Sequence, residues 1–434
     1  MMTKERRDAF TSILREELVP ALGCTEPIAI AYAAAVARHI LGRMPERMEI
    51  SCSGNIVKNV KGVKVPNTGG LKGIRAAGIA GLVAGDPDRG LEVLESVRPS
   101  DFPEIERLLA EGLCTVSLAE DVENLYILVR ATSGADRAEV RIEHSHINVV
   151  HAAHNGIPVE KPTSACATRG MAGSKESHDR HAALLDVESI LEFARTADLS
   201  ELEPILSAQI VLNTAISDEG LEHPYGADIG KTLLKHRGGD VRTRAAARPA
   251  AGSDARMSGC SLPVVINSGS GNQGLTVSLP VVEYAKEMGA PREALLRALV
   301  LSNLTAIHQK ALIGKLSAFC GAVSAACGSG AGIAYLRGGD YRQICDTITN
   351  TLANVGGIVC DGAKPSCAAK IASAVDAAIL AQEMAFDRKV FNPGEGLVAD
   401  TVEGTIANIG RMGKVGMKST DVEILRMMLD TSSC

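Results

Sequence analysis

Residues 114–151 read CTVSLAEDVENLYILVRATSGADRAEVRIEHSHINVVH, and they contain four strand-like runs. Turn-forming residues such as those at 133–136 (SGAD) separate the runs, which cover 114–118, 126–131, 138–144 and 147–151. Short runs of this kind, joined by turn residues, are typical of neighbouring strands connected by hairpins. We therefore predict a mostly antiparallel sheet in this part of the chain.

Helical patterns flank this sheet. Phe10, Ile13, Leu14 and Leu18 recur at the spacing of one helix face. The helices predicted before the sheet cover 4–19, 27–42, 71–83 and 103–112, whereas 47–65 carries β-branched residues and partly alternates like a strand. From Asp186 to the end the pattern is helical and punctuated by Gly, with no convincing run of strands.

These elements predict an α+β protein. A mainly helical domain, an Ala/Gly-rich bundle, is expected over 186–434, and a smaller α+β domain over 46–165. The helices of 1–45 are expected to pack with the helical domain. The polar, irregular stretch 161–182 is typical of an exposed loop or linker.

The composition is that of an ordinary globular protein. The chain has 434 residues with a formal net charge of −6, 46% hydrophobic and 22% charged residues. This mild acidity gives no reason to expect nucleic acid or an anionic membrane as a partner. Neither a signal peptide nor an apolar run of 18 residues is recognisable, so we expect a cytoplasmic protein that does not enter a membrane.

Small residues and cysteines are unusually frequent. There is no Trp, aromatic residues make up 3%, and Gly occurs 43 times, which indicates helices that approach one another closely. Eleven cysteines stay reduced in the cytoplasm, so they are packing residues, nucleophiles or metal ligands rather than a disulfide framework.

Cys24 stands between the first two predicted helices, in the sequence LGCTEP of 22–27. Thr25 is a plausible N-cap, and Pro27 is tolerated in the first helical turn. Cys24 is then placed just before a helix N-terminus. The positive end of the helix dipole is expected to lower the pKa of its thiol.

Two glycine-rich segments resemble phosphate-binding loops only in part. Residues 269–274 (GSGNQG) match G-x-G-x-x-G, but no alternating strand–helix series surrounds them. We favour a polar loop whose backbone N–H groups meet a substrate carboxylate. Residues 226–232 (GADIGKT) have three residues between the glycines where a P-loop needs four, so a turn leading into a helix is expected.

Four histidines lie close together in the sequence, at 144, 146, 151 and 154. His144 and His146 would share one face of a strand, which is compatible with a metal site. No Cys, Asp or Glu stands nearby at a suitable spacing. Solvated histidines, one of them touching substrate, are therefore the favoured interpretation.

Cys360 and Cys367 frame a loop with the sequence CDGAKPSC. Gly and Pro between two cysteines allow a tight turn in which both thiolates reach one metal centre. A separation this long is weak evidence by itself, and buried cysteines that act as small apolar residues remain an alternative.

The sequence resembles the L-cysteine desulfidase family, which is related to the alpha-chain domain of iron–sulfur L-serine dehydratases. The resemblance covers nearly the whole chain. It rests on five motifs: ALGCTEP (21–27), KNVKGVKVPNTGG (58–70), SGSGNQG (268–274), IGKLSAFCGA (313–322) and GGIVCDGAKPSC (356–367). In that family three cysteines separated by forty and then seven positions hold a [4Fe–4S] cluster, and the cysteines at 320, 360 and 367 have these separations.

The resemblance implies roles for individual residues. Cys320, Cys360 and Cys367 would hold the cluster, and Cys24 would act as the base. The C-terminal Cys434 would fill the fourth site of the cluster in the resting protein. Polar loops suggest Thr68, Ser270, Asn272 and Gln273 as substrate-binding residues, whereas Cys327 and Cys345 are interpreted as packing residues.

The resulting expectation is a lyase that works without pyridoxal phosphate. It would convert L-cysteine to hydrogen sulfide, ammonia and pyruvate by β-elimination. Dehydration of L-serine by the same machinery is the nearest alternative. A non-catalytic amino-acid-binding or redox-sensing protein is the alternative from another class. The small-residue helical surface suggests a homodimer.

Overall fold

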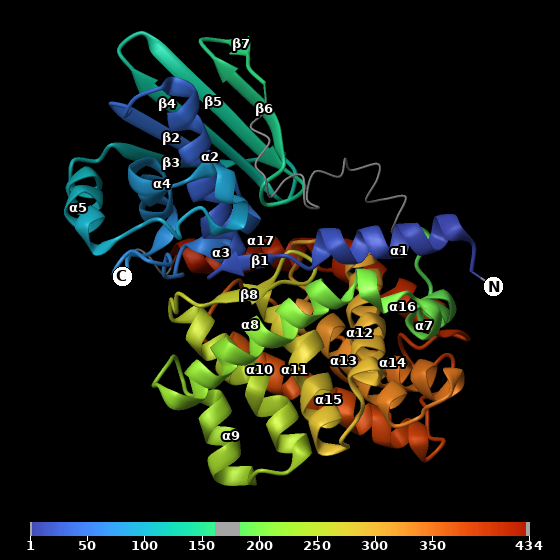
Figure 1. The fold of residues 1–434 in the computed structure, drawn as a ribbon. Coiled ribbons are helices and arrows are strands. Elements are labelled where there is room, and N and C mark those ends of the chain that lie inside the picture. Colours follow the sequence, from blue (N-terminus) through green and yellow to red (C-terminus); the bar gives the residue numbers. More distant parts are fainter. Residues whose placement is uncertain (1, 161–182, 431–434) are drawn as a thin grey trace.

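The structure, a computed structural model, describes residues 2–160 and 183–430, and it consists of two packed parts. Figure 1 shows a twisted sheet with its helices above a larger, mainly helical part. The α+β, mainly helical fold class is confirmed. The predicted linker 161–182 lies outside the described residues, as does Cys166.

The larger sheet has six strands. In spatial order they are β3 (Cys114–Ala119), β2 (Arg47–Ser53), β4 (Tyr126–Ser133), β5 (Asp136–Glu143), β6 (Val149–His154) and β7 (Ile157–Pro158). Only β2 and β3 are parallel, and the other neighbours are antiparallel, as the sequence predicted. Pro158 belongs to the edge strand, where a missing backbone N–H is tolerated.

Three helices support the sheet. Helix α2 (Thr25–Leu41) packs on β4 and β5, α4 (Gly73–Ala84) packs on α2, and α5 (Phe102–Ala110) packs on α4. Small residues permit this close packing, because a Cβ at Gly81 would lie 2.2 Å from the carbonyl oxygen of Ala31. The position of α2 differs from the expectation that all helices of 1–45 pack with the helical part.

The segment after β2 also differs from the prediction. Residues 54–60 form the short helix α3 (Gly54–Val60) instead of continuing the strand. Ile56, Asn59 and Val60 are buried at the i, i+3 and i+4 spacing of one helix face, whereas a strand would place Asn59 and Val60 on opposite faces. β-branched residues favoured a strand here, but tertiary packing overrides that local preference.

The helical part begins with α1 (Lys4–Glu17), whose Phe10 meets Phe193 edge to face at 5.3 Å between ring centres. A two-stranded ribbon of β1 (Pro20–Leu22) and β8 (Pro263–Val265) follows. The remaining helices are α7 (Val187–Thr196), α8 (Glu203–Glu222), α9 (Ile229–Arg237), α10 (Val241–Met257), α11 (Gly271–Glu287), α12 (Arg292–Ile313), α13 (Gly321–Leu336), α14 (Tyr341–Val355), α15 (Cys367–Phe386), α16 (Val402–Arg411) and α17 (Lys418–Asp430).

Helix α17 connects the two parts of the molecule. It follows the single π-helical turn η5 (Met412–Gly416) and packs against α3 of the sheet-bearing part. Figure 1 shows it in red at the boundary, beside α3. Among the helices that the structure describes, none combines the length and the apolar character that crossing a membrane requires.

Candidate functional site

A cavity of about 100 Å³ brings together side chains from segments that are far apart in the sequence. Its walls come from the start of α2, the end of α10, the start of α11, the connection between α12 and α13, and the loop before α15. Seven residues named from the sequence line it: Cys24, Ser270, Asn272, Gln273, Cys320, Cys360 and Cys367. We call this space the cysteine cavity.

Cys24 is the N-cap of α2 and is almost completely buried. The helix begins at Thr25, so the prediction that Thr25 is the N-cap is wrong by one residue. Thr25 instead donates its hydroxyl to the carbonyl of Gly269 at 2.8 Å, which ties α2 to the glycine-rich loop. Burial raises the pKa of the Cys24 thiol to about 12 and outweighs the nearby Arg256, so the expected lowering of this pKa is also wrong.

Cys320 and Cys360 are held side by side by backbone pairing. The amide of Cys320 donates to Ile358 at 3.0 Å, and the amide of Cys360 donates to Ala318 at 2.7 Å. Their thiols form a hydrogen bond, which holds the pKa of Cys360 below its usual range and raises that of Cys320. The hydrogen bond therefore favours the negative charge on Cys360 and the proton on Cys320.

Cys367 opens α15 on the same side of the cavity. Its Sγ accepts from the amide of Lys364 at 3.4 Å and donates to the carbonyl of Gly362 at 3.6 Å. Burial is the main cause of the raised pKa of the Cys24 thiol, and Cys367 lies close enough for its charge to add to that rise. All nine cysteines of the described ranges are free thiols.

Lysines surround the thiols. Lys58 donates to the carbonyl of Cys360 at 3.4 Å, and its charge lowers the pKa of that thiol. Lys310 is buried and donates to the carbonyl of Lys315 at 3.2 Å, and burial lowers the pKa of Lys310 to about 8. Lys364 stands in the loop between Cys360 and Cys367, and its Nζ donates to the carbonyl of Lys58 at 3.2 Å. A cationic environment of this kind favours thiolates.

The opposite wall of the cavity is polar. Ser270 caps α11, its Oγ accepting from the amide of Gln273 at 3.5 Å. Asn272 accepts from Nη1 of Arg256 at 3.0 Å. Nε of Arg256 and Oε1 of Gln273 are buried without a hydrogen-bond partner, so both have bonding capacity left for a molecule in the cavity.

Arg256 and Glu26 are site residues that the sequence reasoning missed. Arg256 is 4% exposed and ends a helix of small residues, so nothing in the local pattern marks it. Glu26 accepts from Nδ2 of Asn59 at 3.1 Å, and burial raises the pKa of its carboxyl. Lys310 escaped notice for the same reason, because it lies in an otherwise apolar helical pattern.

Thr68 is not brought to the cysteine cavity. It is 3% exposed, and its hydroxyl donates to the carbonyl of Val65 at 2.8 Å within its own turn. Cys327 and Cys345 lie away from the cavity as well. Cys327 is completely buried and Cys345 half-buried in the apolar core of the helical part, which agrees with their interpretation as packing residues.

The histidines do not form the arrangement expected from the sequence. β5 ends at Glu143, and His144 has a φ of 70°, so His144 and His146 do not share a strand face. His146 is buried rather than solvated. Its ring contacts the Gly269 loop, both ring nitrogens lack a partner, and burial lowers its pKa to about 3.

No metal site is preassembled in the described ranges 2–160 and 183–430, where no three or more Cys, His, Asp or Glu side chains surround one point. Cys434 lies outside these ranges. The end of α17 is described, and the carbonyl of Met428 accepts from Nζ of Lys61 at 2.5 Å. Gly62, which follows Lys61 in the chain, lies beside the side chain of Lys364. Helix α17 therefore ends near the loop that carries Cys367.

Comparison with known proteins identifies relatives over the whole chain. The profile described as "Serine dehydratase alpha chain" matches residues 88–426. A UPF0597 protein of Lachnoclostridium phytofermentans is 52% identical over 419 residues, which is 96% of this chain and 98% of that protein. UPF0597 protein DSY1109 of Desulfitobacterium hafniense is 51% identical over 100% of both chains, and a UPF0597 protein of Treponema denticola is 46% identical over 99% of both.

Proposed function

The chain belongs to the serine dehydratase alpha chain family, and we propose that it is an iron–sulfur lyase that converts L-cysteine to hydrogen sulfide, ammonia and pyruvate. The observation that carries this proposal is the cysteine cavity. It is lined by the thiols of Cys320, Cys360 and Cys367, by the buried thiol of Cys24, and by a buried arginine with free bonding capacity. These are the groups that β-elimination from a small amino acid needs.

The residues of the cavity fit a [4Fe–4S] cluster held by Cys320, Cys360 and Cys367. Three thiols are available, and thiolates are the ligands that iron–sulfur clusters take. Lys58 and Lys310 supply positive charge beside the thiolates that ligation requires. Binding would release the proton that Cys320 and Cys360 now share, as is usual when thiols become ligands.

When bound with only three protein ligands, such a cluster supplies a Lewis acid that stabilises a departing sulfide or hydroxide. The protein's own residues bind and orient the amino acid. Arg256 pairs with the α-carboxylate through Nε, and Asn272 fixes the guanidinium by accepting from Nη1. Ser270 and Gln273 present polar groups from the start of α11 to the same space.

Cys24 receives the Cα proton in this proposal. Because burial keeps the Cys24 thiol protonated at neutral pH, Sγ first loses its own proton to water and then accepts the Cα proton as a thiolate. The electron pair of the Cα–H bond forms the Cα=Cβ double bond, and the Cβ–S bond breaks so that HS⁻ leaves. The released 2-aminoacrylate takes up water to give ammonia and pyruvate. Because burial makes the Cys24 thiolate a strong base, it is suited to removing a weakly acidic carbon-bound proton.

L-Serine is the second candidate substrate, because the family model that matches residues 88–426 is described as the serine dehydratase alpha chain. Anaerobically purified protein is assayed for sulfide and pyruvate from L-cysteine and for pyruvate from L-serine. Release of sulfide and pyruvate in equal amounts from L-cysteine supports the proposal. Bound iron without turnover of either amino acid would instead favour a redox-sensing protein, for which the paired thiols of Cys320 and Cys360 would be the switch.

Replacing Arg256 with Gln is expected to lower kcat/KM for L-cysteine by a factor of about 10 to 150. The reason is the loss of about 1.5–3 kcal/mol from charge-assisted hydrogen bonds to the carboxylate. Steady-state kinetics check this, with iron content as the control for an intact cavity. Arg337→Gln is the control variant, because Arg337 is an exposed arginine at the C-cap of α13 that does not line the cavity. An unchanged kcat/KM in Arg256→Gln would remove Arg256 from substrate binding.

Replacing Cys434 with Ala is expected to shorten the lifetime of the cluster in air. The proposal is that Cys434 fills the fourth site in the resting protein, and four residues of extended chain reach at most about 14 Å from Asp430. Because α17 ends beside Lys61, near the loop that carries Cys367, a reach of this length is compatible with Cys434 as a ligand. The decay of visible absorbance after exposure to air is measured for both proteins. Equal decay rates and equal resting spectra would contradict this role of Cys434.

A further inference from the structure

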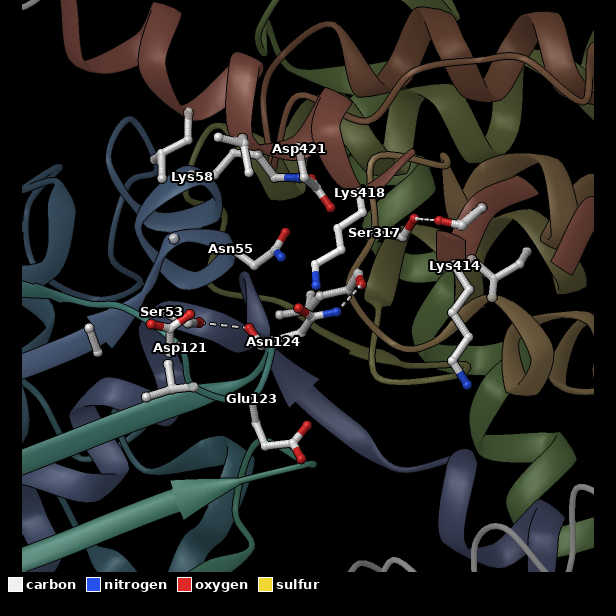
Figure 2. Close-up of a pocket in the computed structure, with 18 residues that line it drawn as sticks. Ser53, Asn55, Lys58, Asp121, Glu123, Asn124, Ser317, Lys414, Lys418 and Asp421 are labelled. Atoms are coloured by element: carbon white, nitrogen blue, oxygen red, sulfur yellow. Dashed lines mark hydrogen bonds and ion pairs between the residues drawn. The ribbon is translucent and has the colours of Figure 1, made fainter. Parts of the chain in front are cut away.

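A second and larger cavity lies at the boundary between the two parts of the molecule (Figure 2). Its volume of about 360 Å³ is in the range that holds small molecules. The junction of β2 and α3 and the loop between β3 and β4 form one side, and η5 and the first half of α17 form the other. We call it the interdomain cavity.

Unpaired charges of both signs face this cavity. Lys414 and Lys418 come from η5 and α17, and Asp121 comes from the loop between β3 and β4. Within the part of the chain that the structure describes, none of these three side chains forms a hydrogen bond or an ion pair. Lys58, by contrast, forms an ion pair with Asp421 of α17. Lys414, Lys418 and Asp121 are exposed, so a ligand in the cavity would replace water at their charged groups.

Neutral polar groups complete the walls. Oδ1 of Asn55 is buried and accepts no hydrogen bond. Ser53 donates to the carbonyl of Asn124 at 2.6 Å, and Asn124 donates to the carbonyl of Leu316 at 3.4 Å, so this wall is fixed. Figure 2 shows Lys418 reaching between Asn55 and Asn124 at the centre of the cavity, while Asp121 lies beside Ser53.

The balance of charges selects the class of ligand. A polyanion such as a nucleotide would be repelled by Asp121 and Glu123, and a polyamine would be repelled by Lys414 and Lys418. A molecule that carries one carboxylate and one ammonium group satisfies both sides. We propose that the interdomain cavity binds a small α-amino acid in its zwitterionic form. Its carboxylate pairs with Lys418, its ammonium group pairs with Asp121, and Oδ1 of Asn55 accepts a further hydrogen bond from the ammonium group.

The interdomain cavity is a separate site with a physical connection to the cysteine cavity. Leu316 and Ser317 line both. Lys58 also links them, because its Nζ pairs with Asp421 on one side and donates to the carbonyl of Cys360 on the other. A molecule bound in the interdomain cavity therefore contacts residues that help to position Cys320 and Cys360.

Calorimetric titration with L-alanine tests the proposal on the full-length protein prepared without oxygen. L-Alanine carries both main-chain charges but has no group on Cβ to eliminate, so no turnover disturbs the measurement. We expect two molecules to bind per chain. Arg256→Gln should remove the one in the cysteine cavity, whereas Lys418→Gln and Asp121→Asn should each weaken the other at least about tenfold and leave turnover of L-cysteine unchanged.

Matched controls separate the outcomes. Lys235→Gln alters an exposed lysine of α9 outside both cavities and should leave both sites intact. Acetate and ethylamine, which carry only one of the two charges, should each bind the interdomain cavity at least about tenfold more weakly than L-alanine. Equal binding of acetate would overturn the zwitterion assignment.

A single L-alanine per chain that disappears in Arg256→Gln would overturn the site altogether, as would two molecules that persist in both Lys418→Gln and Asp121→Asn. Neither result bears on the elimination reaction, which is judged by sulfide and pyruvate release. If the unaltered protein binds L-alanine in the interdomain cavity but releases no sulfide or pyruvate from L-cysteine, the proposed reaction is contradicted and the interdomain site is not.

Discussion

Serine in place of Cys360 is expected to remove the bound iron and to lower turnover of L-cysteine by at least about a thousandfold. The substitution keeps the shape of the side chain but replaces a thiol that becomes a thiolate by a hydroxyl that does not ionise at neutral pH. Cys360 is the most critical of the three proposed ligands, because its charge is favoured by Lys58 and by the hydrogen bond from Cys320. Its backbone pairing with Ala318 should survive the change.

Iron and acid-labile sulfide per chain, visible absorbance and turnover are measured on protein purified without oxygen. Cys345→Ser is the matched control, since Cys345 is a half-buried cysteine of α14 that does not line the cysteine cavity. It should retain its iron and its activity. A Cys360→Ser protein with a full complement of iron and normal turnover would contradict the assignment of this ligand.

Much of the fold is predictable because it follows from local pattern. The strands of 114–154 carry their turn residues between them, and β3 to β6 lie close to where those runs were placed. What local pattern does not contain is the partner of each element. The Ala-rich α2 looks the same whether it packs on a sheet or on helices, and its contacts with β4 and β5 in the assembled structure show where it belongs.

The candidate site was predictable to the extent that its residues carry a chemical signature. Cys24, Cys320, Cys360 and Cys367 stand in the motifs that carry the family resemblance, so the sequence identifies these four residues. Arg256, Glu26 and Lys310 carry no such signature, since charged residues are common and usually solvated. Their burial against the cavity is a property of the assembled helices. The raised pKa of Cys24 has the same origin, because a helix dipole can be read from sequence and desolvation cannot.

Alanine in place of Cys24 is expected to lower kcat for L-cysteine by about 10²–10⁴, the range that positioned general bases contribute. Iron content should stay at the level of the unaltered protein, because Cys24 is not one of the three proposed ligands. KM should change little, since Arg256 still meets the carboxylate. This combination separates a base from a ligand, as loss of a ligand would remove iron and activity together.

The exchange of the Cα proton with solvent gives a sharper test than turnover. A substrate analogue that cannot lose its β substituent, such as L-alanine, should exchange its α-hydrogen in deuterium oxide with the unaltered protein and not with Cys24→Ala. Cys52→Ala is the matched control, because Cys52 is a fully buried cysteine of β2 outside the cavity, and it should exchange normally. Full exchange in Cys24→Ala would move the role of base to another group of the cavity. Glu26 is then the next group to test, because it lines the same cavity and burial raises the pKa of its carboxyl, which strengthens it as a base.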